Sequence, residues 1–210
     1  MVDTQSDFVK NRLAFVAECI EASKKEKPTV EDASMGRTAF IFRRGDDPVL
    51  VHYCTVPDLT PEDFKKFTQN YRQTITKFMS EDKGAKLEMN VLREVDGREI
   101  IHQRMDPGIF MVSARSMVVQ QYVIEEGNGA HIFMTSSKDS ADLEKEFAKE
   151  IGKDVIATLE VNYWHFKPTE DGKGTHVTHV NSSKPNGSIP NIVVNKMTAK
   201  QAEAIIGVSK

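Results

Sequence analysis

The chain has 210 residues and a formal net charge of −3, and its residues are 39% hydrophobic and 28% charged. This balance is typical of a soluble globular protein, and the length fits one large domain over residues 1–210. The slight negative charge argues against a nucleic-acid partner, because phosphate binding needs a concentrated basic surface. The two cysteines, Cys19 and Cys54, are too few for a disulfide framework and lack the spacing of a metal site.

The N-terminal residues 1–7 are polar and acidic and do not resemble a signal peptide. No apolar run approaches the roughly 18 residues that a membrane-spanning helix needs. We therefore expect a cytoplasmic protein.

The first third of the chain predicts two helical regions separated by a hairpin. Ser6 is a possible cap for the first helix, where apolar residues recur at three- and four-residue spacings. Thr60 and Pro61 predict a sharp start for the next helix, since proline is favoured in a first turn. The predicted ranges are 6–23 for the first helix and 38–42 and 49–56 for the strands. The second helical region begins with a helix from Pro61 through Tyr71, and Ile75 and Phe78 indicate a second short helical piece after it.

A meander of antiparallel strands is predicted after this. Asp96-Gly97 is typical of a two-residue hairpin turn, and Gly127-Asn128-Gly129 predicts another turn. The connection over 136–153 can hold one helix, because Leu143, Phe147 and Ile151 recur at every fourth position. The predicted strands cover 86–95, 99–105, 117–125, 130–135, 155–167 and 175–181.

The C-terminal segment predicts a long amphipathic helix that begins directly after the last strand. Ser188 is a plausible cap and Pro190 falls in the first turn, where the missing N–H costs nothing. Ile189, Val193 and Met197 recur at four-residue spacing. A curved sheet that closes around such a helix favours a deep cavity.

An apolar loop is predicted at Ile109–Val112, between Asp106-Pro107-Gly108 and the next strand. Four apolar residues in a loop are unfavourable in water. They either cap an edge of the core or form a lid over a cavity whose tip contacts a membrane.

Isolated polar residues on apolar strands are the other candidate site residues. Gln121 shares a strand face with Met117, Val119 and Val123, and a buried polar group needs a partner. That partner is protein, water or a ligand headgroup. His176 and His179 are three apart on one strand and point to opposite faces, so we expect no metal site, and no phosphate-binding or dinucleotide motif indicates a cofactor.

Three segments resemble the START family, the StAR-related lipid-transfer module. The first is Gly187-Ser188-Ile189-Pro190 with Val193-Val194-Asn195, which resembles the family's entry to its C-terminal helix. The second is Tyr163–Pro168 with Thr175–Val180, similar to the last two strands, and the third is Ser113–Val118, similar to the signature beside the lid loop. The match runs in order from Thr38 to Ile206.

The chain departs from the family pattern at three places. Ser116 replaces the signature aspartate, and residues 182–186 lack the acidic residue that often precedes the helix-entry glycine. Counted from Arg115, the acidic–basic pair of the sterol-handling branch falls on His102 and Gln121. The resemblance therefore implies a polar lipid, such as a phospholipid, in preference to a sterol.

The resemblance implies an α+β helix-grip fold, in which a curved antiparallel sheet wraps around a long C-terminal helix, with an N-terminal helix in addition. It implies non-enzymatic binding and intermembrane transfer of one lipid by a monomer that contacts membranes transiently. Arg104, on the same strand face as His102, is a candidate for a phosphate. The expected lipid-binding residues are His102, Arg104, Ile109, Phe110, Met111, Arg115, Val119, Gln121, Ile189, Val193 and Met197.

Two alternatives stay open from the sequence. The first is an enzyme of the wider helix-grip superfamily, for which His102 and Arg104 offer the one candidate dyad. The second is a lipid-sensing regulatory domain that docks a partner through the stripe Leu143, Phe147 and Ile151.

Overall fold

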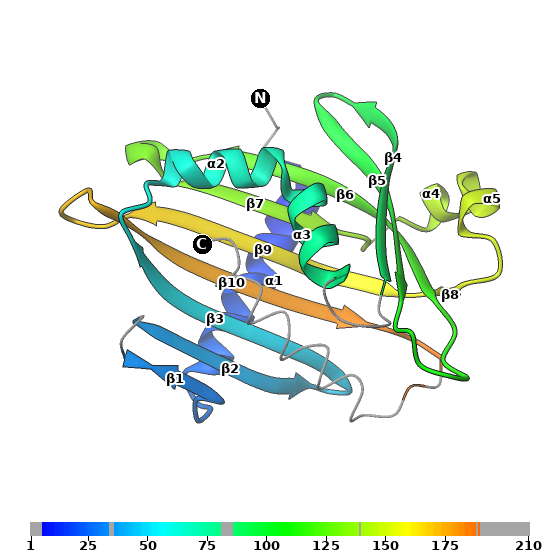
Figure 1. Cartoon of the computed structure of the whole chain (residues 1–210), viewed down its shortest axis with the longest axis horizontal. Coiled ribbons are helices and arrows are strands. Elements are labelled where there is room, and N and C mark those ends of the chain that lie inside the picture. The colour runs from blue at the N-terminus through cyan, green and yellow to red at the C-terminus, as the bar shows by residue number, and fades with distance from the viewer. Residues whose placement is uncertain (1–5, 34–35, 81–85, 139, 188, 190–210) are drawn as a thin grey trace.

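Ten strands form one open sheet in the computed structural model, which describes residues 6–33, 36–80, 86–138, 140–187 and 189. The strand order is β1-β2-β3-β10-β9-β7-β6-β5-β4, with β8 paired to β6, and every pairing except β6–β8 is antiparallel (Figure 1). The strands are β1 Val30–Asp32, β2 Arg37–Arg44, β3 Asp47–Pro57, β4 Lys86–Val95, β5 Arg98–Asp106, β6 Arg115–Glu125, β7 His131–Ser136, β8 Val155–Ile156, β9 Thr158–Pro168 and β10 Gly174–Lys184.

The two described helices with caps predicted from the sequence, α1 and α2, begin at those caps. The Ser6 hydroxyl accepts a hydrogen bond from the Val9 amide at 3.4 Å, and the Asp63 carboxylate accepts one from the Thr60 amide at 2.9 Å. The helices are α1 Asp7–Ser23, α2 Pro61–Gln69, α3 Tyr71–Ser80, α4 Ala141–Glu146 and α5 Ala148–Ile151, with a 3-10 turn at Gly127–Gly129.

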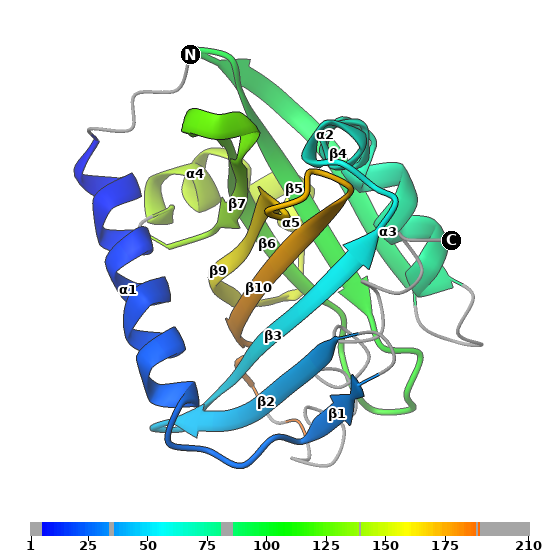
Figure 2. The same cartoon turned by 90° about the vertical axis from the view of Figure 1, so that its left-hand side faces the viewer.

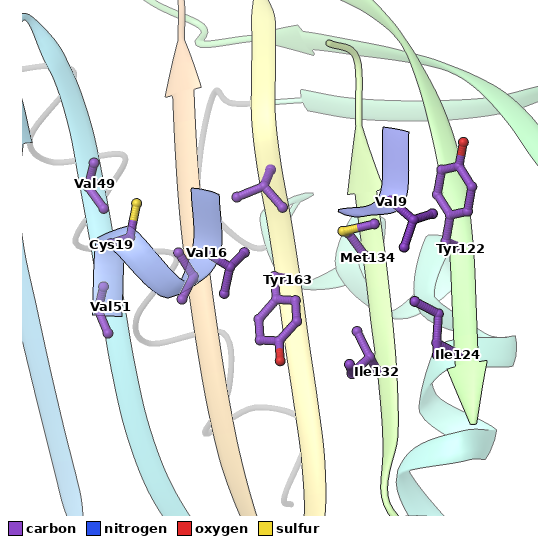
Figure 3. Close-up of a cluster of buried hydrophobic side chains, with 12 residues drawn as sticks. Val9, Val16, Cys19, Val49, Val51, Tyr122, Ile124, Ile132, Met134 and Tyr163 are labelled. Atoms are coloured by element: carbon purple, nitrogen blue, oxygen red, sulfur yellow. The ribbon is translucent and has the colours of Figure 1, made fainter. Parts of the chain in front are cut away.

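Helices cover both faces of the sheet, as Figure 2 shows. On the α1 face, Val9, Val16 and Cys19 pack onto apolar side chains of β3, β6, β7, β9 and β10 (Figure 3). On the α2/α3 face, Phe64 and Phe67 pack on Trp164 and Phe166. The central strands are therefore buried on both sides, which explains why β9 has no simple alternation of apolar and polar residues.

The strand and helix assignments from the sequence are confirmed in most places and differ in three. The connection over 136–153 holds two short helices, because Phe147 leaves helical geometry between α4 and α5. The predicted strand 155–167 divides into β8 and β9, since Val155 and Ile156 pair in parallel with the start of β6. Strand β1 was not predicted, and the predicted C-terminal helix lies outside the described residues.

Within the described ranges, no helix is long and apolar enough to cross a membrane.

Replacing Val16 by Ala tests the packing of α1 on the sheet. Val16 is 3% exposed within the cluster of Figure 3, so removal of two methyl groups should lower the free energy of unfolding by about 2 kcal/mol. Urea denaturation followed by circular dichroism measures the change. Lys10→Ala, at an exposed position of the same helix, should change stability by less than about 0.5 kcal/mol. Equal effects of the two substitutions would contradict this packing.

Candidate functional site

A cavity lies on the α2/α3 face of the sheet, bounded by α3 and by strands β4, β5, β6, β9 and β10. It is the candidate site because side chains from distant parts of the sequence converge on it. The lining residues are Tyr71, Ile75, Leu87, Gln103, Met105, Pro107, Arg115, Met117, Ala157, Leu159, Asn162, Trp164, His179, Asn181, Ser183, Pro185 and Ile189.

The lining is largely apolar and holds few charges. Leu87, Met105, Met117 and Leu159 form apolar walls on four different strands. None of the described lining residues is an aspartate or a glutamate, and Arg115 is the one lysine or arginine among them. Such a lining favours a ligand that is mainly apolar with a small polar part.

Arg115 is 6% exposed and lies at the end of the cavity where β10 leaves the sheet. Its guanidinium donates to the Pro185 carbonyl at 3.3 Å, to the Asn186 carbonyl at 3.2 Å and to the Ser113 carbonyl. Desolvation lowers its pKa. Within the described residues no carboxylate lies within ion-pair distance of Arg115, so this buried positive charge is balanced by carbonyl dipoles alone.

A hydrogen-bonded cluster centred on Asn162 forms the polar side of the cavity. The Asn162 amide nitrogen donates to the Tyr71 hydroxyl at 2.8 Å, and its oxygen accepts from the Trp164 indole at 3.0 Å. His179 Nε2 lies 2.9 Å from the same oxygen, and its ring stacks on the Trp164 indole with 4.1 Å between centroids. Burial raises the pKa of the Tyr71 hydroxyl, so the cluster is neutral.

His52 lies beside His179 on the neighbouring strand β3. Burial and, to a smaller extent, the nearby Arg37 guanidinium together lower the pKa of His52 to about 4. Burial holds the pKa of His179 well below its usual range. Both imidazoles are therefore uncharged at neutral pH.

The expected lipid-binding residues divide into several groups. Arg115 and Ile189 line the cavity, and Val119 and Gln121 lie on the same face of β6 as the lining residue Met117. The Gln121 side-chain oxygen is buried and has no hydrogen-bond partner in the part of the chain that the structure describes. Val193 and Met197 lie outside the described residues.

His102 and Arg104 lie on the opposite face of β5 from the lining residues Gln103 and Met105. His102 Nε2 is 3.0 Å from the Ser116 hydroxyl, and Arg104 pairs with Asp154 at 2.8 Å. His102 and Arg104 therefore point away from the cavity, because successive side chains along a strand point to opposite faces of the sheet. This geometry does not favour the prediction that these two side chains contact a bound lipid.

Ile109, Phe110 and Met111 form the tip of the loop that connects β5 to β6. Their side chains are 42%, 91% and 88% exposed, and this makes them three of the four most exposed large hydrophobic residues of the described chain. Pro107, at the base of the loop, lines the cavity. An exposed apolar tip beside a cavity is unusual for a surface that contacts only water.

Sequence reasoning missed the polar side of the cavity, including Tyr71, Asn162, His179 and Asn181. The same signal that identified Gln121 was present for Asn162, which is a polar residue between the apolar Val161 and Tyr163. This signal was obscured because both faces of β9 are buried, so the strand shows no simple alternation of apolar and polar residues against which Asn162 would stand out. The described residues contain no group of three or more histidine, cysteine, aspartate or glutamate side chains arranged for a metal ion.

The fold is similar to solved structures of START domains. Human STARD10 has a TM-score of 0.67 and 16% identity, over 99% of this chain and 80% of that one. Human StAR-related lipid transfer protein 5 has a TM-score of 0.67 and 12% identity, over 98% and 96%. A STAR-related lipid transfer protein from Xanthomonas axonopodis has a TM-score of 0.59 and 16% identity, over 86% and 94%.

Neither a family model nor a curated protein matches the sequence. The structural likeness nevertheless confirms the predicted fold, an α+β arrangement with the open antiparallel sheet of START domains. At these identities the likeness concerns the fold.

The buried histidines predict that stability falls as the pH is lowered. Their folded-state pKa values lie below the value of about 6.5 expected in the unfolded chain, so the unfolded state binds protons first. The free energy of unfolding should therefore fall between pH 7 and pH 5, by about 2 kcal/mol for His52 alone. Denaturant titrations across this range measure the slope.

His179→Phe should make this pH dependence shallower, since it removes one of the groups that resists protonation. Thr178→Ser, on the same strand and without a titratable group, should leave the slope unchanged. A wild-type slope in H179F would contradict the assignment of His179 as a buried neutral imidazole.

Proposed function

We propose that residues 1–210 form one START-like domain that binds a single lipid and transfers it between membranes without chemical change. The observation that carries this proposal is a largely apolar cavity on the inner face of a START-type sheet. Two of the similar structures are StAR-related lipid transfer proteins, which supports the same role here. Each methylene removed from water contributes about 0.8 kcal/mol, so one acyl chain in such a cavity contributes roughly 10 kcal/mol.

We favour a phospholipid or a related polar lipid over a sterol. Arg115 is the one lysine or arginine among the described lining residues, and no carboxylate accompanies it. An anionic phosphate would complement this charge, whereas an uncharged sterol would not. We further propose that the protein acts in the cytoplasm as a monomer and does not bind nucleic acid.

A non-enzymatic role is supported by the position of the candidate dyad. An enzyme of this fold would need His102 and Arg104 in the cavity, and both lie on the α1 face of β5. Their polar atoms are engaged by Ser116 and Asp154.

Membrane contact is supported by the loop tip formed by Ile109, Phe110 and Met111. Burial of these apolar side chains in the interfacial region of a bilayer would be favourable, and the adjoining Pro107 lines the cavity. Contact at this loop would bring a bilayer next to the cavity.

Native mass spectrometry of the protein purified from cells tests the binding activity. We expect a one-to-one adduct whose fragments identify a phospholipid or a related polar lipid. We also expect the protein to accelerate the transfer of a fluorescent phospholipid between vesicles. Apo protein that neither binds nor transfers phospholipids, sphingolipids or sterols would contradict the proposal.

The double substitution Phe110→Ser with Met111→Ser tests the membrane contact. Both side chains are exposed, so stability should change by less than about 0.5 kcal/mol. The rate of vesicle-to-vesicle transfer should fall by roughly tenfold or more, because about 2 kcal/mol of apolar burial is lost. The control F110L with M111L keeps the apolar surface and should retain transfer; unchanged transfer by the serine variant would contradict a role for this loop.

A further inference from the structure

Two buried histidines, His52 of β3 and His179 of β10, are direct partners across neighbouring antiparallel strands. Both lie on the α2/α3 face of the sheet and are at most 2% exposed, and His179 lines the cavity. Directly opposed side chains on one face have Cβ atoms about 5 Å apart. Each ring has one nitrogen bonded within the protein and one buried nitrogen that finds no partner among the described residues.

The hydrogen-bond network fixes the tautomer of His179. The Trp164 indole can only donate, so the Asn162 side-chain atom that faces it must be the oxygen. His179 Nε2 is 2.9 Å from that oxygen and must therefore carry a hydrogen. A neutral imidazole with hydrogen on Nε2 has a bare acceptor at Nδ1, and His179 Nδ1 is the unpartnered atom.

The same reasoning gives His52 the opposite tautomer. The Arg37 guanidinium can only donate, and its Nε lies 3.0 Å from His52 Nε2. His52 Nε2 is therefore the acceptor and Nδ1 carries the hydrogen. His52 Nδ1 is also buried without a partner, so it is a donor that nothing in the described chain satisfies.

Among the described residues, His52 Nδ1–H is a hydrogen-bond donor without a partner, and His179 Nδ1 is an acceptor without a partner. A group that both accepts and donates a hydrogen bond would therefore fit between these two opposed residues. We propose that His52 and His179 form a receptor for a free hydroxyl of the bound lipid, which accepts from His52 Nδ1–H and donates to His179 Nδ1. This inference rests on the proposed function and narrows its ligand to lipids with a free hydroxyl. A phosphodiester alone does not fit, because its oxygens only accept.

His131 distinguishes this pair from an isolated buried nitrogen. It is also buried, with an unpartnered Nε2 and its ring 4.9 Å from the ring of Phe166. However, neither His131 nor its cross-strand partners Glu125 and Phe166 are among the described lining residues. His52 is not a lining residue either, but it is directly opposed to one, His179. His131→Phe is therefore a matched control for His179→Phe, because each substitution keeps a ring in contact with an aromatic neighbour.

The test uses delipidated full-length protein, vesicles of dioleoylphosphatidylcholine and native mass spectrometry. The vesicles carry one member of a lipid pair that differs in hydroxyl groups: dioleoylphosphatidylglycerol or dioleoylphosphatidylpropanol, dioleoylglycerol or dioleoylpropanediol, cholesterol or cholest-5-ene. The three pairs distinguish a phospholipid headgroup, a neutral diacyl lipid and a sterol as the source of the hydroxyl.

For the lipid pair that binds, we expect the wild type to bind the lipid with the hydroxyl group roughly tenfold or more tightly than the lipid without it. The reason is that the lipid without the hydroxyl group leaves His52 Nδ1 and His179 Nδ1 unpaired. H179F should reduce this preference to near parity, and H131F should keep it. If the wild type binds both lipids of a pair equally, the hydroxyl receptor is overturned, and the result indicates that the two histidines hold a water molecule. This comparison needs no variant. In that case the proposed lipid transfer would stand, whereas failure to bind any lipid, including phosphatidylcholine, would contradict both.

Discussion

The central strands are buried on both faces, and this constraint governs the rest of the molecule. Along β9 every residue from Leu159 to Trp164 is buried, between α1 on one side and the cavity and α3 on the other. A polar side chain in such a strand cannot reach bulk water. It must therefore find a partner in the protein or in a bound ligand.

Each face meets this requirement differently. On the α1 face, Glu160 pairs with Arg12 at 3.0 Å and so ties the N-terminal helix to β9. On the cavity face, Asn162 joins Tyr71, Trp164 and His179 in one network. Among the described residues, each arrangement leaves one buried nitrogen without a partner, Arg12 Nε on the α1 face and His179 Nδ1 on the cavity face. Of the two residues, His179 is the one that lines the cavity, where a ligand can reach it.

The two ends of the cavity differ in charge. His179 lies five residues before Lys184, the last residue of β10, or roughly 17 Å at strand spacing, and Pro185 follows directly. Arg115 binds carbonyls at the Pro185 end, close to the loop that exposes Phe110 and Met111, whereas the neutral histidine pair lies toward the other end. An amphiphile with separate polar groups suits such a cavity better than a uniformly apolar ligand.

Much of the fold could be predicted from the sequence, because hairpin turns, caps and the periodicity of α1 are local signals. The Asp96-Gly97 turn, the Thr60 cap and the apolar loop at Ile109–Val112 could all be read from neighbouring residues. The family resemblance supplied the sheet architecture, which the likeness to START structures confirms.

The site itself depended on tertiary structure. Counting along the sequence grouped His102 with Gln121, yet the pleat turns His102 to the α1 face while Gln121 faces the other way. Asn162, His179 and Tyr71 come from three elements that only strand pairing and helix packing bring together. The sequence by itself determined which segments become strands and helices, since those preferences are local. Only the tertiary structure decided which polar atoms meet and which stay unpaired, because hydrogen-bond partners distant in sequence depend on register and on the face that each strand presents.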